Sequence, residues 1–369
     1  KNSEVVLENI EVANSMSGAD VRALNITISG CLFHDNANPS DLAGLRASFI
    51  AFSGSDEATV NVENTKVYDN SGERAGLVIV NASGVPPTST TVKMNNVEVS
   101  GNEAELVSGL DIEPSSGNTI VFIDISSSTV ANNSTTATVD RSNADPLNKI
   151  RLSGMIASLA NLQPGNHLVN VTIANNTMTN NVDNLAAVAG FFITSFNATS
   201  PLSQVNTTVV NNTVIHPGVD GSIGSLPAFS LISFDQSGST VTSGGSVQNS
   251  LIANNKFNGQ IRSCRTDFSL STFELSGTVD LTPVNNGNNI TDDPNCTGYD
   301  YQSNIYSTLG PLQYNGGQVK TIALLPGSLA INAGGRVLGV STDARGIARP
   351  TDCVSVGAFQ FEGAVCGAS

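Results

Sequence analysis

The sequence predicts an all-β chain that winds as a right-handed parallel β-helix, with an irregular Gly/Pro-rich cap at the C-terminal end. The first observation is a pattern seen in Val60–Asn70: two apolar residues two apart, an Asn two positions later, a third apolar residue and a closing Asn. Alternation places Val60 and Val62 on one face of a strand and Asn61 on the other. Asn64 then falls where the chain must turn.

The second observation is that this pattern returns at a spacing typical of solenoids. Successive copies are mostly about 31 to 38 residues apart, with one step of about 21 and one of about 48. Coils that stack would place Val60, Val92 and Ile123 in one internal aliphatic column. The other copies are Val5–Val12, Ile26–Asn36, Val92–Asn102, Ile123–Asn133, Val171–Asn181, Val209–Val214 and Val247–Asn255.

The recurring Asn has two explanations, which the sequence leaves open. Stacked Asn side chains can hydrogen-bond along the axis of the coil. Alternatively, Asn recurs because it is a good turn former. The predicted coil does not depend on which explanation holds.

A second apolar stretch follows each copy, and small residues such as Ala75-Gly76 open several of these stretches. One period therefore holds at least two short strands, and amphipathic helix patterns of useful length are missing. A β-sandwich or propeller is the alternative, but the period is too long for a hairpin and Asn-Gly dipeptides are rare before residue 258. The second stretches are Leu45–Ser53, Leu77–Val80, Leu106–Ile112, Ile150–Leu159, Val188–Phe196 and Leu226–Phe234.

The chain divides into two parts. Residues 1–275 form the coils, with a loop inserted near residues 134–148 that accounts for the longest step. That loop is either a binding loop or a plain surface loop. Residues 276–369 form the last coils and the cap. The segment that contains Ala323-Leu-Leu and Leu329-Ala-Ile is expected to fold over the exposed apolar floor of the last coil, and Asp343 and Arg345 to pair and fix this cap.

Four blocks of the C-terminal part, in order, carry a family resemblance: Leu309–Gly317, Ala323–Gly334, Thr342–Gly346 and Val356–Gln360. This run resembles the C-terminal part of choice-of-anchor Q domain proteins, and the resemblance covers roughly residues 285–362. Asn332, Val356 and Gln360 depart from the family pattern. The resemblance implies a right-handed β-helix in a secreted or surface-exposed protein, and it implies no catalytic activity.

The composition narrows the function further. The net charge is −15 with a pI near 4.4, a balance that repels nucleic acid and anionic membranes. No apolar run reaches about 18 residues, so no membrane span is expected. No cofactor is expected either, although the acidic surface suits a calcium-containing exterior.

The five cysteines suggest an oxidising compartment. None forms a Cys-x-x-Cys pair, which argues against a zinc site. We predict disulfides between Cys264 and Cys296 and between Cys353 and Cys366. Cys31 lies inside a repeat and is expected to be a buried free thiol.

Sequons for N-glycosylation are frequent, as expected in a chain rich in Asn, Ser and Thr. In a eukaryotic protein several would carry glycans, because β-helix turns are exposed; in a bacterial protein most would be bare. The candidate sites are Asn25, Asn81, Asn132, Asn133, Asn170, Asn175, Asn197, Asn206, Asn211, Asn289 and Asn295.

Evidence for catalysis is weak. Glycan cleavage requires paired carboxylates or a base in a groove, but the doublet Asp292-Asp293 precedes Pro294 and is typical of a turn. Trp, a common sugar platform, is absent. We therefore expect a non-enzymatic extracellular protein: a structural rod, an adhesin, or a component of a filament or sheath. The alternative is a β-helix that binds or cleaves polysaccharide.

Two surfaces are candidate partner sites. The first coil, Val5–Val12, offers an open edge for end-to-end self-association or for an upstream domain. The outward Thr, Ser and Asn positions could form a face that binds an extracellular glycan or ice. Ice is disfavoured because the outward residues vary too much for a regular array; they include Asn61, Lys93, Asp124 and Thr172.

Overall fold

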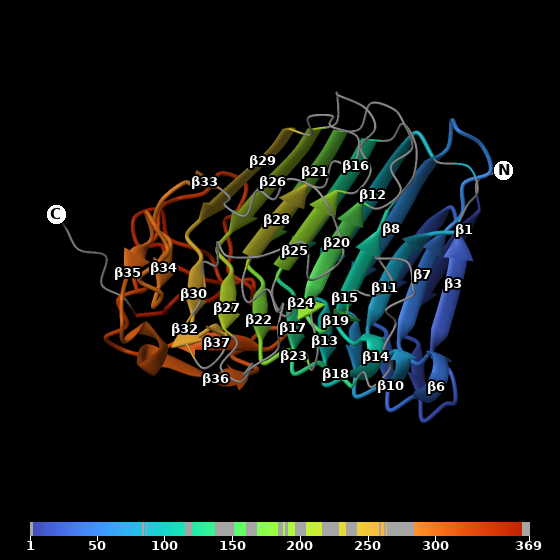
Figure 1. The fold of residues 1–369 in the computed structure, drawn as a ribbon, viewed down its shortest axis with the longest axis horizontal. Helices are drawn as coiled ribbons and strands as arrows, with labels where there is room; N and C mark the ends of the chain where they lie inside the picture. Colours follow the sequence, from blue (N-terminus) through green and yellow to red (C-terminus); the bar gives the residue numbers. More distant parts are fainter. Residues whose placement is uncertain are drawn as a thin grey trace.

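The protein is a parallel β-helix whose strands lie in stacked layers (Figure 1). We describe it from a computed structural model. The described residues are 3–82, 85, 87–114, 120–136, 151–159, 168–183, 187–188, 191–195, 204–215, 229–233, 242–257, 260–261, 263 and 284–363.

A complete coil contains four strands, where the sequence predicted at least two. In the third coil these are β8 (Glu57–Glu63), β9 (Lys66–Tyr68), β10 (Ser71–Arg74) and β11 (Leu77–Asn81). Each strand pairs in parallel with its counterparts in neighbouring coils, which gives sheet A through β8, sheet B through β9, sheet D through β10 and sheet C through β11. The second apolar stretch found in the sequence is the strand of sheet C.

The remaining strands follow the same order. Sheet A also contains β1 (Glu4–Glu8), β4 (Asn25–Ser29), β12 (Ser89–Asn95), β16 (Ile120–Ser126), β21 (Leu168–Ala174), β26 (Gln204–Val210), β29 (Thr242–Gln248) and β33 (Val284–Asn285). Sheet B also contains β2 (Glu11–Ala13), β5 (Leu32–His34), β13 (Glu98–Ser100), β17 (Thr129–Ala131), β22 (Thr177–Thr179), β27 (Thr213–Ile215), β30 (Leu251–Ala253), β34 (Ile290–Thr291) and β35 (Asp300–Tyr301).

Sheets C and D are shorter. Sheet C also contains β3 (Ala19–Ala23), β7 (Leu45–Phe49), β15 (Leu110–Glu113), β20 (Met155–Leu159), β25 (Phe191–Ser195) and β28 (Phe229–Ser233). Sheet D also contains β6 (Ala37–Leu42), β14 (Glu103–Val107), β18 (Ser134–Thr135), β19 (Arg151–Leu152), β23 (Val182–Asp183) and β24 (Ala187–Val188). Two antiparallel pairs, β31 (Lys256–Phe257) with β32 (Gln260–Ile261) and β36 (Leu309–Gln313) with β37 (Thr321–Leu324), and the 3₁₀ helix η2 (Ile305–Thr308) complete the described elements.

The predicted aliphatic column is confirmed. Val60 pairs with Val92, and Val92 pairs with Ile123, in parallel register. All three side chains are buried in one core that runs from coil to coil. The insertion predicted near residues 134–148 lies largely outside the described residues, but Ser134 and Thr135 still belong to sheet D, so it cannot begin before them.

Both explanations for the recurring Asn hold, at different corners of the coil. At the corner after each long strand, Asn64, Asn96, Asn175, Asn211 and Asn249 adopt φ values between 49° and 58°, the left-handed conformation that Asn tolerates. The Asn that closes each copy instead forms a buried ladder.

In this ladder each amide links one coil to the next. The Oδ1 of Asn102 accepts hydrogen bonds from the backbone N–H of Asn70, at 3.1 Å, and from its Nδ2, at 3.0 Å. Asn102 Nδ2 donates to Val67 O at 3.0 Å and to Asn133 Oδ1 at 3.0 Å. The ladder residues are Asn36, Asn70, Asn102, Asn133 and Asn181.

Small residues before the strands of sheet C are required by a close approach of neighbouring coils. A Cβ on Gly76 would lie 1.9 Å from the carbonyl oxygen of Gly109, and a Cβ on Gly109 would lie 2.0 Å from that of Gly154. Backbone therefore stacks directly on backbone at this corner, which only Gly permits.

The C-terminal segment does not lie where the sequence placed it. Ile322 and Leu324 pack with Ile215 and Leu251 on the outer side of sheet B, and Thr129 Oγ1 donates to Lys320 O at 2.5 Å. Figure 1 shows β36 and β37 beneath β22 and β27, along the side of the coil. The prediction that Ala323-Leu-Leu covers the end of the solenoid is therefore wrong, because these apolar residues complete the outer side of a sheet. We call residues 309–361 the strap.

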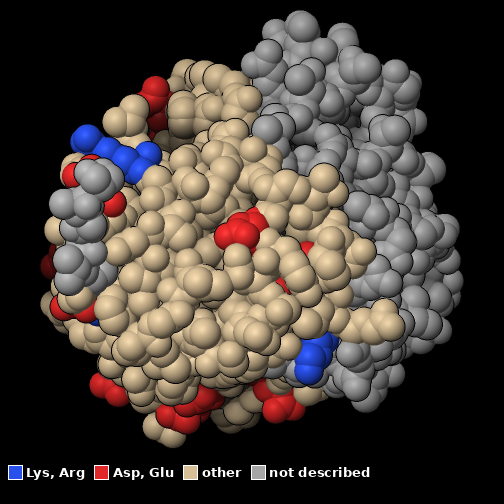
Figure 2. Space-filling view, turned by 90° about the vertical axis from the view of Figure 1, so that its left-hand side faces the viewer, with Lys and Arg blue, Asp and Glu red and all other residues tan. Residues whose placement is uncertain are grey.

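A different segment closes the C-terminal end. Tyr299 packs against the main core, and burial raises its pKa to about 12. Asp292 accepts the backbone N–H of Asn254 at 2.8 Å, and Asp293 accepts that of Asn295 at 2.9 Å, which confirms that the carboxylate doublet forms a turn. Figure 2 views this end and shows a surface made mainly of uncharged residues.

We predict that Asn102→Ala lowers the free energy of unfolding by about 3 kcal/mol, because it leaves the Asn70 N–H buried without an acceptor and removes the amide links to Asn70 and Asn133. Asn95→Ala is the matched control. Asn95 is exposed and donates only to Ser126 Oγ, so its loss should cost less than about 1 kcal/mol. Urea unfolding followed by circular dichroism measures both, and equal losses would contradict the proposed importance of the ladder.

Candidate functional site

The outer face of sheet A is the candidate functional site. In sheet B the strap covers the outer side, so every residue of β13, β17 and β22 is buried. The strands of sheet A keep their alternation, with buried residues inside and accessible ones outside, as in β8 and β16. Sheet A therefore presents a regular surface that no described segment covers along these strands.

Parallel register aligns the outward residues of this face into columns. Asn61, Lys93, Asp124, Thr172 and Thr208 are neighbours in one column. These include the four outward positions expected from the sequence. Neighbours in a column are about 4.8 Å apart, the spacing of hydrogen-bonded strands. Polar groups thus recur at a fixed interval along the coil axis.

The adjacent column adds amides, hydroxyls and one aromatic ring. It contains Thr59, Thr91, Phe122, Asn170 and Asn206 in register. Asn206 Nδ2 donates to Asn170 Oδ1 at 3.1 Å, which fixes the orientation of both amides. The other lone pairs and N–H groups of these amides remain directed at the exposed face and can pair with hydroxyl groups of a ligand.

Phe122 is an exposed aromatic ring on an otherwise polar face. Its side chain is 44 % exposed, and Ile120, two residues earlier on the same face of β16, is 40 % exposed. An exposed ring flanked by amides and hydroxyls suits a ligand with one apolar and one hydroxylated side, such as a sugar ring.

A polar cavity of about 580 Å³ lies at the N-terminal end of this face. Its lining includes Asn25, Thr27 and Thr59 from the sheet and the carboxylates of Glu4 and Glu57. The loop beside it is held by Asp56, which accepts the backbone N–H groups of Phe52 at 2.7 Å and Ser53 at 2.9 Å. The N-terminal end of the face is therefore bordered by a cavity whose lining includes carboxylate, amide and hydroxyl acceptors.

The one carboxylate at the centre of the face has no carboxylate neighbour in its column. Burial raises the pKa of Asp124, and the positive charge of Lys93 opposes that rise. Its in-register neighbours are Lys93 and Thr172. Paired carboxylates, which acid–base cleavage of a glycan requires, are not formed at this position.

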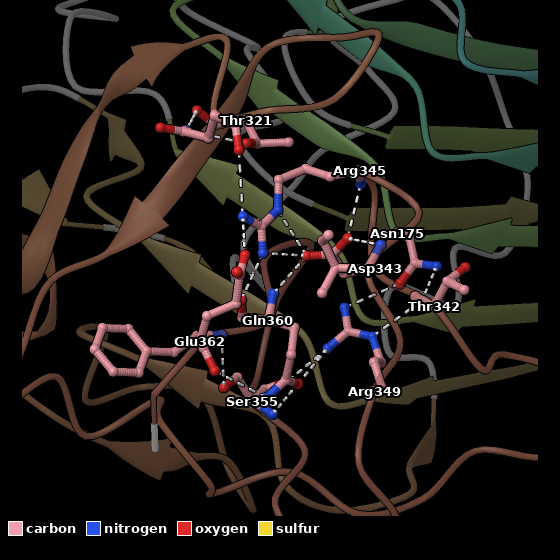
Figure 3. Close-up of polar contacts among 12 residues, drawn as sticks. Asn175, Thr321, Thr342, Asp343, Arg345, Arg349, Ser355, Gln360 and Glu362 are labelled. Atoms are coloured by element: carbon pink, nitrogen blue, oxygen red, sulfur yellow. Dashed lines mark hydrogen bonds and ion pairs between the residues drawn. The ribbon is translucent and has the colours of Figure 1, made fainter.

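Asp343 and Arg345, which the sequence predicts as a pair, lie at the centre of a polar network in the strap (Figure 3). Arg345 Nη2 lies 2.8 Å from Asp343 Oδ2, and both side chains are buried. Asp343 also accepts the backbone N–H of Gln360 at 2.9 Å, and the guanidinium of Arg345 stacks 3.7 Å from the ring centre of Phe359. The pair therefore joins two of the sequence blocks and is structural.

Arg349 ties this network to the coil. Its Nη2 donates to Asn175 Oδ1 at 3.0 Å, and Asn175 Nδ2 donates to Thr342 O at 2.8 Å. Its other acceptors include Ser355 O and Gly357 O, so the hydrogen bonds of this guanidinium to described residues all go to uncharged groups. Burial accordingly lowers the pKa of Arg349 to about 10.

The strap is also attached near its first turn, through residues that the sequence analysis did not single out. Tyr314 donates to Glu98 Oε2 at 2.7 Å and accepts from Lys66 Nζ at 2.7 Å. Lys320 Nζ lies 2.9 Å from Glu98 Oε1. Burial, followed by the Glu98 carboxylate, raises the pKa of Tyr314. A Glu among the otherwise uncharged outward positions of β13, β17 and β22 was the only signal of this contact in the sequence.

The cysteine predictions are partly resolved. Cys31 is a buried free thiol, as predicted. Cys296 and Cys353 are buried and disulfide-bonded. Cys264 and Cys366 lie outside the described residues, so the two pairings stay predictions.

The predicted glycosylation sites fall into a buried group and an accessible group. Asn133, Asn175, Asn211 and Asn289 are buried, and the amides of Asn133, Asn175 and Asn289 donate hydrogen bonds inside the fold. The expectation that the sequons lie at exposed turns is wrong for these four, because an attached glycan would have to fit inside the packed structure. Glycosylation stays a prediction for the accessible Asn25, Asn81, Asn132, Asn170, Asn206 and Asn295, and Asn197 lies outside the described residues.

Comparison with known families supports the fold and goes no further. Residues 1–147 match the family model of the right handed beta helix region. The coil is a right-handed parallel β-helix. No curated protein matches the chain. None of the helices in the described ranges has the length and apolarity needed to cross a bilayer. The same ranges hold no group of three or more His, Cys, Asp or Glu placed to bind a metal ion.

We predict that Glu98→Ala loosens the N-terminal part of the strap and lowers the free energy of unfolding by about 2 kcal/mol, because Tyr314 and Lys320 lose their shared acceptor. Proteolysis between β36 and β37 should become faster, which mass spectrometry of the fragments measures. Glu63→Ala is the control, since Glu63 is exposed and accepts only from Ser29 Oγ at 3.2 Å. Unchanged cleavage in the Glu98 variant would show that the strap is held without this contact.

We also predict that the first coils are more stable at pH 6 than at pH 8. His34 bridges Asp35 at 2.7 Å and Glu11 at 3.0 Å, and its ring stacks on Tyr68. The hydrogen bond to Asp35 raises the pKa of His34 above its ordinary value of about 6.5. The protonated His34 therefore stabilises the fold, and this stabilisation is complete at pH values below the pKa of His34 in the unfolded chain. It is lost as the pH rises through the higher pKa of His34 in the folded protein.

Hydrogen exchange of β2, β5 and β9 tests this prediction. Protection corrected for the intrinsic exchange rate should fall between pH 6 and pH 8 in the wild type, and the difference should vanish in His34→Gln. A pH-dependent difference that persists in the variant would assign the effect to another group.

Proposed function

We propose that this protein is an extracellular, non-catalytic β-helix that binds polysaccharide along the outer face of sheet A, and that it acts as an adhesive rod. The observation that carries the proposal is the in-register array of Asn and Thr side chains around the exposed ring of Phe122. A polysaccharide is a repeating chain of hydroxylated rings, and this face offers repeating hydrogen-bond groups along one axis.

The charge of the face supports hydrogen bonding rather than ion pairing as the mode of recognition. In the central column Lys93 and Asp124 are direct neighbours, so their charges offset each other. The ligand would gain amide and hydroxyl contacts at several coils, each worth about 1 kcal/mol net. Many such contacts in a row give useful affinity to an extended ligand.

The in-register neighbours of Asp124 argue for binding without cleavage at the centre of the face. Asp124 has Lys93 and Thr172 as its in-register neighbours, and no carboxylate stands beside it in the column. The alternative, a polysaccharide-cleaving enzyme, would need a second acidic group or a base facing the same bond.

A position on the cell surface or outside the cell remains part of the proposal. It rests on the resemblance of the strap to choice-of-anchor Q domain proteins and on the disulfide-bonded Cys296 and Cys353. Localisation of the full-length gene product, by surface labelling of intact cells, tests it, and labelling only after lysis would contradict it.

We predict that Phe122→Ala weakens polysaccharide binding about tenfold, a loss near 1.4 kcal/mol, because the stacking platform is removed. A glycan array followed by calorimetry on the best ligand measures this. Tyr306→Ala is the matched control: Tyr306 is 43 % exposed but belongs to η2, outside sheet A. Equal losses in both variants would contradict the assignment to this face, and release of shorter glycans would contradict a non-catalytic role.

A second candidate function is end-to-end self-association through the first coil. Within the described residues β1, β2 and β3 each pair on one side only, with β4, β5 and β7. The inward residues Val5, Leu7 and Val12 are only partly buried. An edge of this kind accepts another strand. Light scattering and electron microscopy over a range of concentrations test the idea, and a monodisperse monomer throughout would contradict it.

A further inference from the structure

The strap crosses a corner of the coil where three asparagines stack, one in each of three neighbouring coils. Asn175, Asn211 and Asn249 follow β21, β26 and β29, and their backbones are linked in order by hydrogen bonds from Asn175 N to Val210 O and from Asn211 N to Gln248 O. All three have positive φ. Because the three positions are equivalent in the coil, we expect their side chains to form equivalent hydrogen bonds with the strap.

The two outer asparagines bind the strap. The Asn175 amide donates to Thr342 O and accepts from Arg349. The Asn249 amide donates to Gly335 O at 2.5 Å and accepts from Gly335 N at 3.0 Å. Each therefore has both its donor and its acceptor satisfied by the strap.

Asn211, which lies between them, has no partner for its side-chain donor or for its side-chain acceptor. Its side chain is 1 % exposed, and neither its Nδ2 nor its Oδ1 has a hydrogen-bond partner in the protein. A buried amide without partners is destabilising, because neither its donor nor its acceptor regains the hydrogen bonds it made with water. Asn211 thus keeps an unpaired donor and an unpaired acceptor, and the residue lines the space beneath the strap.

That space is a cavity of about 270 Å³ between the coil and the strap. Asn211 lies at the coil side. Arg336 and Ser341 come from one irregular segment of the strap and Thr351 from a later one, and Val337, Leu338, Val340, Pro350 and Val354 supply apolar contact. The lining contains no carboxylate.

The charge of the cavity is positive in a protein whose net charge is −15. Arg349 lines it, and the hydrogen bonds of that guanidinium go to uncharged acceptors. Arg336 is accessible and makes no hydrogen bond or ion pair with a described residue. An anionic group entering the cavity would find an unpaired guanidinium.

We propose that this cavity binds one sugar-acid residue, a ring that carries both hydroxyl groups and a carboxylate. The proposal rests on the proposed function, because it names the chemistry of one residue of the bound polysaccharide. The carboxylate pairs with Arg336. A ring hydroxyl donates to Asn211 Oδ1, and a ring oxygen accepts from Asn211 Nδ2. The carbon-bound hydrogens lie against Val337 and Pro350.

The position of the cavity suits this role. Val210, the last residue of β26 and an outward position of sheet A, immediately precedes Asn211. Ser126, Ala174 and Val210 are in register, so this column at the edge of sheet A leads to the corner, where Ala174 and Val210 are buried. The cavity therefore adjoins the edge of the sheet A face, and a chain bound on the accessible part of the face would reach it past Ala174 and Val210.

Ligand-observed NMR titration of the intact protein with D-glucuronate and with D-glucose tests the proposal. Glucuronate should bind at least tenfold more tightly than glucose. Asn211→Ser and Arg336→Gln should each weaken glucuronate binding at least fivefold. Ser127 occupies the equivalent corner one coil before Asn175 with a φ of 50°, so the Asn211→Ser backbone fits without strain. Arg336 is accessible, so its variant folds in any case.

Three results would overturn the proposal: equal binding of glucose and glucuronate, binding of sulfate as tight as glucuronate with no effect of Asn211→Ser, or no binding of glucuronate at all. These results are separable from the fate of the proposed function. Phe122→Ala reports on the face alone. Polysaccharide binding that depends on Phe122 but not on Asn211 or Arg336 would contradict the proposed role of the cavity and leave the proposed role of the sheet A face intact.

Discussion

The buried amide ladder is the interaction on which the rest of the structure depends. Each Asn in it after Asn36 accepts a backbone N–H and a side-chain N–H from the coil before it, and donates to a backbone carbonyl of that coil. A shift of one residue between coils would break all of these hydrogen bonds and turn the aliphatic column outward. The ladder therefore sets one register, and the columns on the outer face of sheet A exist only because that register is fixed.

The strap follows from a change in the outward residues of sheet B. In the first coils these positions carry Glu11 and Lys66 and are accessible, whereas in later coils they carry Ile215 and Leu251, which are buried. An apolar sheet face needs a second layer, and the strap provides it with Ile322 and Leu324. The Glu98 contact marks the point where covered sheet gives way to open sheet.

Sequence periodicity was sufficient to predict the coil, because inward residues such as Val60 and Ile123 repeat at period two within strands and at a fixed corner between them. It could not place the strap. Ala323-Leu-Leu predicts that its segment packs against an apolar surface. The pattern does not distinguish the apolar outer side of a sheet from the apolar end of the coil. It also misjudged Asn133 and Asn289, because a sequon is a local pattern while burial in a ladder depends on coils some 31 to 48 residues away. Asn211 looked like any other turn asparagine, since its lack of partners arises only once the strap is in place.

The cavity beneath the strap has a geometric cause. The strap is fixed to Asn249 at Gly335 and to Asn175 at Thr342. These two asparagines are two coils apart, a distance of about 10 Å. The seven-residue step from Gly335 to Thr342 would span about 23 Å if extended. More chain is present than the span requires, so the middle of the step must bow outward, and it does so over the one asparagine that neither attachment uses.

A segment that only had to cover the corner could be shorter and could bond Asn211 as it bonds its neighbours. The extra length instead places Arg336 in the lining of the same cavity as the unpaired amide, which is why we assign a ligand, rather than packing alone, to this part of the strap.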